Sequence, residues 1–209
     1  DIGWTNFRNN MNSFDCLAFM EDDDGHVEVF VDNVVISFAR GSTFPTVTTD
    51  GIFEYLNKPC AYHYKGAYDR TYITFIDSEG NIKVKYYDHN RKIFSDEYLV
   101  ASIGTSDDHA APTLIINDTG YIIVFYTAPL YCKVSTNPED ITSWNTAVQI
   151  HDGYCTYPKP WQDENGVYHV TYRYWTDSNH RYVIHSYSNN LSTWTHETLI
   201  DFGAGTWVY

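Results

Sequence analysis

The chain of 209 residues is acidic, with 13 Lys and Arg against 27 Asp and Glu, a formal net charge of −14 and a pI near 4.8. A protein of this charge repels phosphate backbones and anionic lipid surfaces, so we expect neither nucleic acid nor a membrane among its partners. No apolar stretch approaches the roughly 18 residues that a transmembrane helix needs. Aromatic residues make up 17% of the chain and apolar residues occur in short bursts, a composition that favours an all-β fold.

Turns that end in glycine follow one another along the chain and predict β-hairpins. A glycine after Asp or Asn supplies the positive φ that tight hairpins need. The four turns and the alternating strands that follow them are Asp22–Gly25 with Val27–Val31, Asp77–Gly80 with Ile82–Tyr86, Asn117–Gly120 with Tyr121–Tyr126, and Asp163–Gly166 with Val167–Arg173. Gly80, Gly120 and Gly166 are spaced by 40 and 46 residues, and Gly25 lies 55 residues upstream of Gly80. A period of this size is typical of the blades of a β-propeller.

The repeats predict an all-β chain that forms a single β-propeller domain, or a fragment of one, from four-stranded antiparallel blades. A proline opens three of the repeats, at Pro59, Pro112 and Pro160. We expect the blades to span approximately residues 1–50, 51–104, 105–152 and 153–209. A closed propeller has about four to eight blades. Residues 202–209 are typical of the start of another strand, so we expect about four blades of a longer propeller, with a small closed ring as the alternative.

Two further segments resemble worn Asp-box turns. They span residues 135–144 and 186–194, and their tryptophans, Trp144 and Trp194, are 50 residues apart, again one blade. Such a turn joins the third and fourth strands of a blade. We therefore expect both tryptophans to pack against their blades rather than to contact a ligand.

The sequence gives little indication of a metal or a cofactor. Cys16, Cys60, Cys132 and Cys155 lack the C-x-x-C spacing of a metal clip, and buried free thiols are expected, although three disulfide pairings are open. The acidic turn Asp22–Gly25 lacks the full spacing of a calcium loop and is typical of a solvated hairpin. We expect no required cofactor and no metal ligands, with structural calcium as an unsupported alternative.

The segment Asp107-Asp108-His109-Ala110-Ala111-Pro112, followed by residues 118–126, resembles the BNR-repeat propellers that include the ulvan-type polysaccharide lyases. The resemblance extends over roughly residues 57–200. It implies a seven-bladed propeller that cuts acidic polysaccharides by β-elimination, with His, Tyr and Arg side chains around a uronic acid. The matching positions here are His109, Tyr157 and Arg173. Tyr157 and Arg173 are 16 residues apart, on the first and second strands of one expected blade.

The chemistry of β-elimination accounts for these residue types. Arg173 would neutralise the substrate carboxylate and stabilise the developing enolate. Tyr157 would do the acid and base work, and His109 would be a second proton-transfer group or a carboxylate partner. We expect Lys58, Arg70 and Tyr126 to bind substrate.

Each of these residues also has a purely structural interpretation. His109 could belong to a capped turn, Tyr157 could pack at the start of a strand, and Arg173 could form an ion pair. The family pattern commonly has a second His about where Pro129 stands. This departure puts activity on the family's substrate in question, but it leaves sugar binding unaffected.

Three functions follow as hypotheses. The first is a secreted or surface lyase that acts on a uronic-acid-containing polysaccharide. The second is a catalytically idle propeller that binds a cell-surface glycan or receptor, as in an adhesion or virion fibre protein, and the third is a structural propeller of a larger assembly. Sialidase chemistry is disfavoured, because it needs three arginines on one carboxylate and the 6 Arg of the chain are scattered. The chain begins at Asp1 without a recognisable leader, which leaves a leader or a larger upstream region open.

Overall fold

The computed structural model describes residues 18–21, 27–31, 34–38, 46–52, 59–127, 129–177 and 180–204. The chain divides into two compact units, Asp1–Thr46 and Val47–Tyr209, which we describe separately. In the first unit, three antiparallel strands form a meander in the order β1 (Ala18–Glu21), β2 (Val27–Val31) and β3 (Val34–Phe38). The predicted strand Val27–Val31 is confirmed, whereas the predicted turn Asp22–Gly25 lies outside the described residues.

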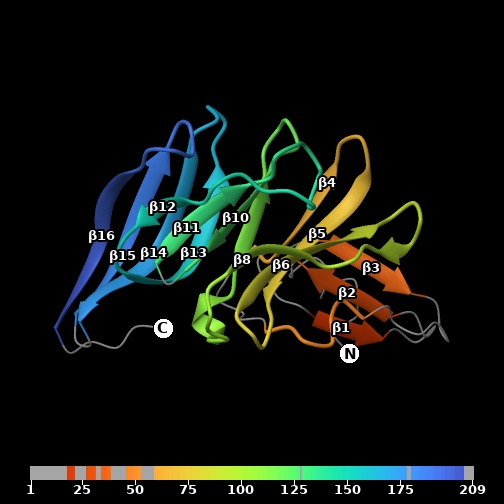
Figure 1. The fold of residues 1–209 in the computed structure, drawn as a ribbon, viewed down its shortest axis with the longest axis horizontal. Coiled ribbons are helices and arrows are strands. Elements are labelled where there is room, and N and C mark those ends of the chain that lie inside the picture. The colour runs from red at the N-terminus through yellow and green to blue at the C-terminus, as the bar shows by residue number, and fades with distance from the viewer. Residues whose placement is uncertain are drawn as a thin grey trace, which may run out of the picture. The chain divides into compact units, whose positions relative to one another are not determined.

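The second unit consists of three antiparallel sheets that follow one another along the chain (Figure 1). The first sheet contains β4 (Ala61–Lys65), β5 (Asp69–Ile76), β6 (Asn81–Asp88), β7 (Ile93–Phe94) and β8 (Tyr98–Ser102). The second contains β9 (Thr113–Ile116), β10 (Ile122–Tyr126), β11 (Leu130–Val134) and β12 (Val148–His151). The third contains β13 (Tyr154–Gln162), β14 (Tyr168–Asp177), β15 (His180–Ser188) and β16 (Thr195–Ala204). A 3-10 turn, η2 (Asp108–Ala110), precedes β9.

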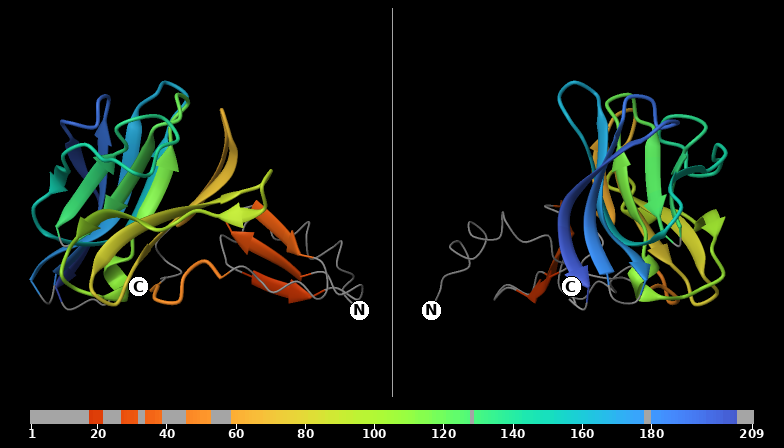
Figure 2. Two further views of the ribbon diagram at one scale, coloured as in Figure 1. Left: turned by 45° about the vertical axis from the view of Figure 1, so that its right-hand side comes forward. Right: turned by 90° about the vertical axis from the view of Figure 1, so that its left-hand side faces the viewer.

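Each sheet of the second unit is four strands wide. In the first sheet, β7 and β8 pair with opposite halves of β6, so together they occupy the place of a fourth strand. The first strands β4, β9 and β13 lie side by side, and the other strands extend away from them (Figure 2). This is the arrangement of consecutive propeller blades, and the all-β prediction with four-stranded antiparallel sheets is confirmed. No helix in the described part of the chain is long and apolar enough to span a membrane.

The inner strands of the middle sheet, β9 and β10, are buried on both faces. All five residues of β10 are buried. Ile122, Val124 and Tyr126 belong to the core shared with the first sheet, whereas Ile123 and Phe125 belong to the core shared with the third sheet. Because alternate side chains of a strand point to opposite faces, a strand between two cores must be apolar at every position, which accounts for the unbroken run from Ile122 to Tyr126.

The turn glycines mark hairpins, but not always the same hairpin of a blade. Gly80, Gly120 and Gly166 have φ values of 79°, 86° and 80°, which confirms the backbone requirement. The turns at Gly120 and Gly166 join the first and second strands of their sheets, whereas the turn at Gly80 joins the second and third. The 40-residue spacing between Gly80 and Gly120 therefore does not measure one blade, because turn chemistry does not reveal which two strands it connects.

The Asp-box-like turns lie where the sequence predicts them, between the third and fourth strands of their sheets. In the first turn, the Asp140 carboxylate accepts a hydrogen bond from the backbone N–H of Thr142, and the indole N–H of Trp144 donates to the carbonyl of Ile141. Trp144 packs against the core between the first and second sheets, and Trp194 packs against the core between the second and third. Their predicted packing role is confirmed.

Cys132 and Cys155 are free thiols. Cys132 and Cys155 are buried and Cys60 is half-buried, whereas Cys16 lies outside the described residues. Burial raises the pKa of the Cys132 thiol and of the Cys155 thiol to about 12. Both thiols are therefore protonated at neutral pH and act as small apolar side chains.

The buried carboxylate of Asp77 organises the hairpin between β5 and β6. It accepts hydrogen bonds from the backbone N–H groups of Glu79 and Asn81 and from the side chain of Asn81, and it lies 2.9 Å from Lys83 Nζ. Burial acts to raise the pKa of Asp77, but the bonds from Lys83 and Asn81 outweigh it and lower the pKa to about 2.

We expect Asp77→Ala to lower the free energy of unfolding by about 2 kcal/mol at pH 7, because the folded state favours the ionised carboxylate. Since the folded pKa lies below the unfolded value, this contribution is present above about pH 4 and is lost as the pH falls towards about 2. Urea unfolding of both proteins between pH 7 and pH 3 checks it. The control Asp152→Ala, at a side chain that is 91% exposed, should change stability little, and equal stability of Asp77→Ala and wild type at pH 7 would contradict the assignment.

Candidate active site

The loop between β8 and β9 carries the first site residue, His109, in the short turn η2. Asp107 caps this turn, and its Oδ1 accepts a hydrogen bond of 3.0 Å from the backbone N–H of His109. Ala110 and Ala111 follow and are buried in the core, which anchors the loop. Two carboxylate oxygens also lie close to His109 Nδ1, Asp107 Oδ1 at 2.8 Å and Asp108 Oδ1 at 2.7 Å.

These carboxylates orient the imidazole. An Nδ1–H that donates to a carboxylate leaves Nε2 to exchange a proton, the arrangement that suits a histidine for acid–base work. Burial acts to raise the pKa of Asp107, but hydrogen bonds from the backbone and the imidazole of His109 hold it below its usual value. Asp107 therefore stays ionised beside the ring at neutral pH.

The second site residue, Tyr157, lies on a β-bulge in the first strand of the third sheet. The pairing of β13 with β14 shifts register between Thr156 and Lys159, and Tyr157 has a φ of 59°. A positive φ is costly for a residue with a large side chain, by about 1 to 3 kcal/mol, and bulges often redirect a side chain next to an active site. The ring of Tyr157 is 9% exposed.

The third site residue, Arg173, lies on β14 directly opposite Thr156. Its side chain is buried, and its Nε donates a hydrogen bond of 3.0 Å to Thr156 Oγ1. Its guanidinium carbon lies 4.5 Å from the centre of the Tyr157 ring and 4.8 Å from the centre of the Trp175 ring. The hydrogen bond and the two rings hold the cation in one place, which prepares it for an anionic ligand.

The structure brings the three predicted catalytic residues together from three separate segments. The rings of His109 and Tyr157 have their centres 5.5 Å apart, and the guanidinium of Arg173 lies over the Tyr157 ring. A proton-transfer imidazole, a phenol and a buried guanidinium thus share one end of β13 and β14. Their catalytic roles stay predictions, but their proximity is now a structural fact.

An aromatic surface beside this cluster was not predicted. Tyr154 and Trp175 are cross-strand partners whose rings stack with centres 4.4 Å apart and planes 8° apart. Tyr154 is 43% exposed, and Arg181 lies against the Trp175 ring at 4.2 Å. The alternation of Arg173 and Trp175 on one strand was the only sequence signal for this surface, because the pairing with Tyr154 depends on the register of two strands.

The predicted substrate-binding residues do not join the cluster. Lys58 lies outside the described residues. Arg70 is held between the rings of Tyr68 and Tyr86, at 3.8 and 3.9 Å from their centres, and its Nε lies 3.6 Å from an Asp88 oxygen. Arg70 therefore has a structural ion pair away from the cluster, although its buried Nε makes no hydrogen bond among the described residues, and its contact with substrate stays a prediction.

Tyr126 likewise lies in the core. It is 5% exposed and stacks on Tyr131, with ring centres 5.6 Å apart. Burial raises the pKa of Tyr126 to about 12. A ring so enclosed offers no surface to a polysaccharide, so its predicted substrate contact is not supported by its position.

Two groups of side chains in the described residues have donor atoms close enough to share a metal ion. One is Asp107, Asp108 and His109 in the candidate active site, and the other is His63, Asp69 and His89 in the first sheet. Within each group the donor atoms lie within 4.8 Å of one another. The sequence singles out neither group, and its expectation of no metal ligands stays a prediction.

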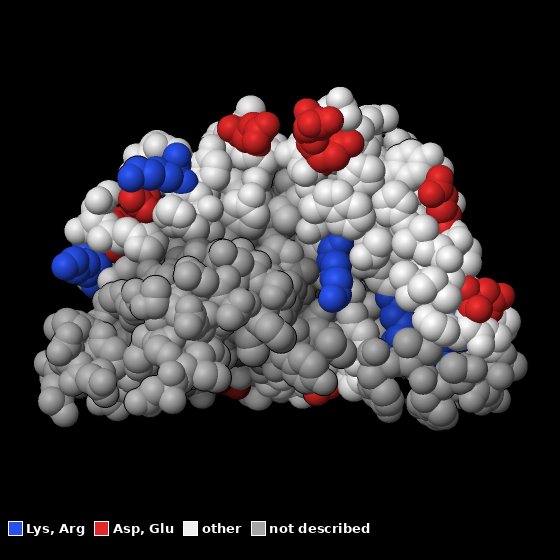
Figure 3. Space-filling view, turned by 180° about the vertical axis from the view of Figure 1, so that it is seen from behind, with Lys and Arg blue, Asp and Glu red and all other residues white. Residues whose placement is uncertain are grey.

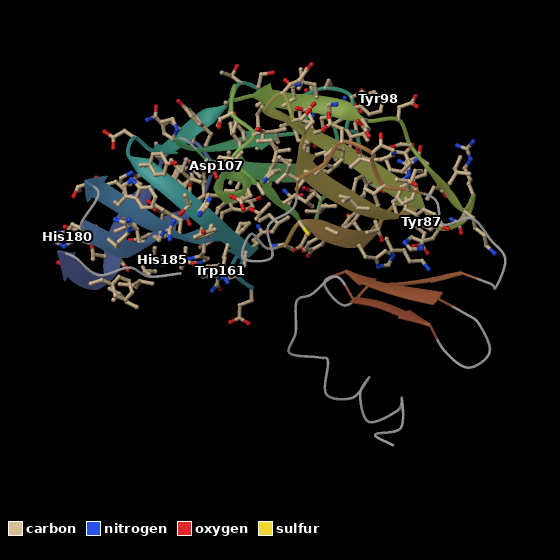
Figure 4. All side chains as sticks on the ribbon, turned by 90° about the horizontal axis from the view of Figure 1, so that it is seen from below. Tyr87, Tyr98, Asp107, Trp161, His180 and His185 are labelled. Atoms are coloured by element: carbon tan, nitrogen blue, oxygen red, sulfur yellow. The ribbon has the colours of Figure 1, made fainter. Side chains whose placement is uncertain are left out.

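A cavity of about 220 Å³ lies at the other end of the first strands. It is lined by residues of β4, β9 and β13 and by acidic turn residues, among them Tyr62, Ile115, Trp161 and Asp163. Trp161 is 41% exposed and its ring stacks on that of His169, with centres 4.9 Å apart. The site residues and this cavity are at opposite ends of β13 (Figure 4, which labels Asp107 and Trp161).

Charged side chains of both signs are scattered over the face seen in Figure 3. Acidic side chains lie mainly along its upper and right margins, and basic ones lie at its left margin and in its middle, without a continuous basic surface in the described part of this face. The net charge of −14 makes the overall field repulsive to anions, so any attraction to an anionic ligand would have to come from individual cations such as Arg173.

The family comparison covers the second unit. A family described as "BNR repeat-containing family member" matches residues 70–206, which include all three sheets in large part and the three site residues. No curated protein sequence matches the chain significantly.

Solved structures with similar folds are enzymes that act on glycans. An ulvan lyase of polysaccharide lyase family PL25 matches with a TM-score of 0.58 and 18% identity, over 74% of this chain and 40% of that enzyme. The GH93 α-L-arabinofuranosidase of Fusarium graminearum matches with a TM-score of 0.52 and 13% identity, over 84% of this chain and 58% of that enzyme. A xylan β-1,4-xylosidase from Bacillus halodurans C-125 matches with a TM-score of 0.51 and 12% identity, over 86% of this chain and 38% of that enzyme.

These matches establish the fold. The chain spans about 40% of the length of the ulvan lyase. The likenesses, together with the three consecutive four-stranded sheets, show the β-propeller fold that the sequence predicts.

Proposed function

Because this chain belongs to the BNR repeat-containing family, we propose that it is a polysaccharide lyase that cleaves an acidic, uronic-acid-containing polysaccharide by β-elimination. The observation that carries the proposal is the cluster of His109, Tyr157 and Arg173, in which a buried cation lies against a phenol and a carboxylate-oriented imidazole. These are the groups that β-elimination next to a carboxylate requires.

Arg173 binds the carboxylate of the uronic acid. Proton loss from the carbon next to a carboxylate produces a dianion-like enolate, which is too high in energy to form unless a nearby cation neutralises part of its charge. A guanidinium fits because its planar fork of N–H donors matches a carboxylate. Because Arg173 is buried and oriented by Thr156, little reorganisation accompanies the charge development.

Tyr157 and His109 transfer the protons. One of them removes the proton from the carbon that bears the carboxylate, and the electron pair of that C–H bond forms the new carbon–carbon double bond. The bond to the neighbouring glycosidic oxygen breaks and its electron pair stays on the oxygen, which takes up a proton from the other residue. Atoms and charges balance, and the products are a new reducing end and an unsaturated uronate.

The stacked pair Tyr154 and Trp175 provides a surface for a sugar ring beside the reacting residue. Aromatic faces cover the apolar faces of pyranoses while polar groups take the hydroxyls. Since such polymers are met outside cells, we also propose a secreted or cell-surface location.

A second candidate function is glycan binding without cleavage. The observation that favours it is Pro129 at the position where the family pattern commonly has a histidine. Pro129 lies in the turn between β10 and β11, at the same end of the sheets as η2. If that imidazole is essential to the chemistry, the remaining cluster would bind a uronate without cleaving the chain.

The test is incubation with a panel of uronate polymers, including ulvan, while the ultraviolet absorbance of the unsaturated uronate is followed. The proposal expects the absorbance to rise in step with new reducing ends. New reducing ends without the absorbance would indicate hydrolysis and contradict the lyase. Binding without either product would support the second candidate, and neither binding nor product with any polymer would contradict both.

We expect Trp175→Ala to weaken glycan binding about tenfold, or about 1.4 kcal/mol, because it removes the stacking surface beside Arg173. Trp161→Ala, at the cavity on the other end of β13, should leave binding unchanged. Isothermal titration calorimetry with an oligosaccharide measures both. The reverse pattern would place the glycan in the cavity instead.

A further inference from the structure

The second group of metal donors lies in the first sheet, on three adjacent strands. His63 is on β4, Asp69 begins β5, and His89 directly follows β6, whose end is labelled at Tyr87 in Figure 4. The N–H of His89 donates to the carbonyl of Asp69 at 2.9 Å, so the two residues are cross-strand neighbours. The paired backbones hold all three side chains in place.

This group is separate from the candidate active site. Asp69 is at the start of β5, whereas the turn at the other end of β5 packs on the loop that leads to η2, where the N–H of Ile103 donates to the carbonyl of Gly80 at 2.9 Å. The whole length of β5 therefore lies between the group and that loop. Nothing in the lyase chemistry uses these side chains.

The donor atoms are close to one another. His63 Nε2 lies 2.8 Å from Asp69 Oδ1, and the donor atoms of all three residues lie within 4.8 Å. The rings of His63 and His89 meet edge to face, with centres 5.1 Å apart. Around a tetrahedral zinc ion with bonds of about 2.1 Å the ligand atoms are about 3.4 Å apart, so modest side-chain rotations bring the three donors into place.

The surroundings prepare these groups as ligands. Thr71 Oγ1 lies 2.8 Å from His89 Nε2 and fixes the ring through one nitrogen, as the outer hydrogen bonds of metal-binding histidines do. Lys65 Nζ lies 3.2 Å from Asp69 Oδ2, which leaves Oδ1 directed at His63.

We propose that His63, Asp69 and His89 bind a divalent transition-metal ion, Zn²⁺ by ligand type, with water in the fourth position. Two imidazoles and one carboxylate are a ligand set that zinc accepts, and three protein ligands leave one position open. The side chains of His63 and Asp69 are 39% and 21% exposed, which gives an ion access from solvent. The ion would tie β4, β5 and β6 together at the edge of the sheet, and its role is structural in this proposal.

The experiment uses the full chain, stripped with a chelator and titrated with zinc chloride in competition with a chromophoric chelator. His109→Ala serves as the background in every protein, because it removes the histidine from the other group of donors and leaves that group with only two carboxylates. We expect one zinc ion per chain, and we expect His63→Ala and His89→Ala to weaken its binding at least tenfold. The melting temperature should rise with zinc in the background protein and stay constant in these two variants.

The matched control is His180→Ala, which removes a histidine hydrogen-bonded to a carboxylate, that of Asp201, without a third donor nearby among the described residues. It should bind zinc as tightly as the background protein. Equal affinity of His63→Ala, His89→Ala and His180→Ala would overturn the proposal. Circular dichroism of the chelator-treated variants checks that each one folds. If an alanine variant does not fold, His63→Gln, at the more exposed of the two histidines, is used in its place.

Discussion

Arg173→Met should lower kcat/KM on the uronate polymer by about a thousandfold, equivalent to about 4 kcal/mol of transition-state stabilisation. The substitution keeps much of the apolar stem but removes the positive charge that lies against Tyr157. Without it the enolate has no counter-charge, and the effect should fall mainly on kcat because charge develops in the transition state. Steady-state kinetics of product absorbance measure it.

Two further variants make this result interpretable. Arg173→Lys keeps the charge but loses the planar fork, so it should recover part of the activity. Arg91→Met makes the same change of net charge at an exposed turn residue and should leave kcat/KM unchanged. If Arg173→Met keeps more than a tenth of the wild-type activity while remaining folded, Arg173 does not neutralise the substrate carboxylate.

Tyr157→Phe should reduce kcat by about a thousandfold, because general acid–base catalysis contributes factors of about 10² to 10⁴. The ring and its contacts with His109 and Arg173 are kept, and only the hydroxyl is lost. Substrate affinity should therefore change little. The pH profile of the residual activity should lose one of its two limbs, which a merely structural tyrosine would not cause.

The control for Tyr157→Phe is Tyr131→Phe, which removes a hydroxyl from a ring in the core stack with Tyr126. It should have wild-type kcat and an unchanged pH profile. Unchanged kcat in Tyr157→Phe would assign the proton transfers to His109 and another group, and would contradict the role proposed for the phenol.

Local sequence signals predict much of this fold because they have local physical causes. The turn glycines need positive φ, and the run from Ile122 to Tyr126 needs two apolar surroundings. The strands predicted after the turns begin within one residue of the observed strands, although β14 continues four residues beyond its predicted end at Arg173. The prediction that the turns at Gly80 and Gly120 occupy equivalent places in their blades is wrong. A turn sequence does not determine which two strands of a sheet it connects.

The candidate site likewise has some features that the sequence predicts and others that only the structure reveals. The 16-residue spacing of Tyr157 and Arg173 matches the family pattern, and the two residues do meet. The bulge that places Tyr157 leaves no sequence signal beyond Pro158, and Tyr154 meets Trp175 only through cross-strand register. Arg70 is ambiguous in the sequence, since a charged residue among tyrosines indicates either a ligand or an ion pair, and only the structure reveals Asp88.

Mass spectrometry of the products formed from a defined uronate oligosaccharide tests the central claim most directly. If His109, Tyr157 and Arg173 form a β-elimination site, the fragment with the new non-reducing end will be lighter by one water than the corresponding hydrolysis product, and Arg173→Met will form almost none of it. Fragments with the full mass of the hydrolysis product, or equal yields of the lighter fragment from wild type and Arg173→Met, would contradict the account.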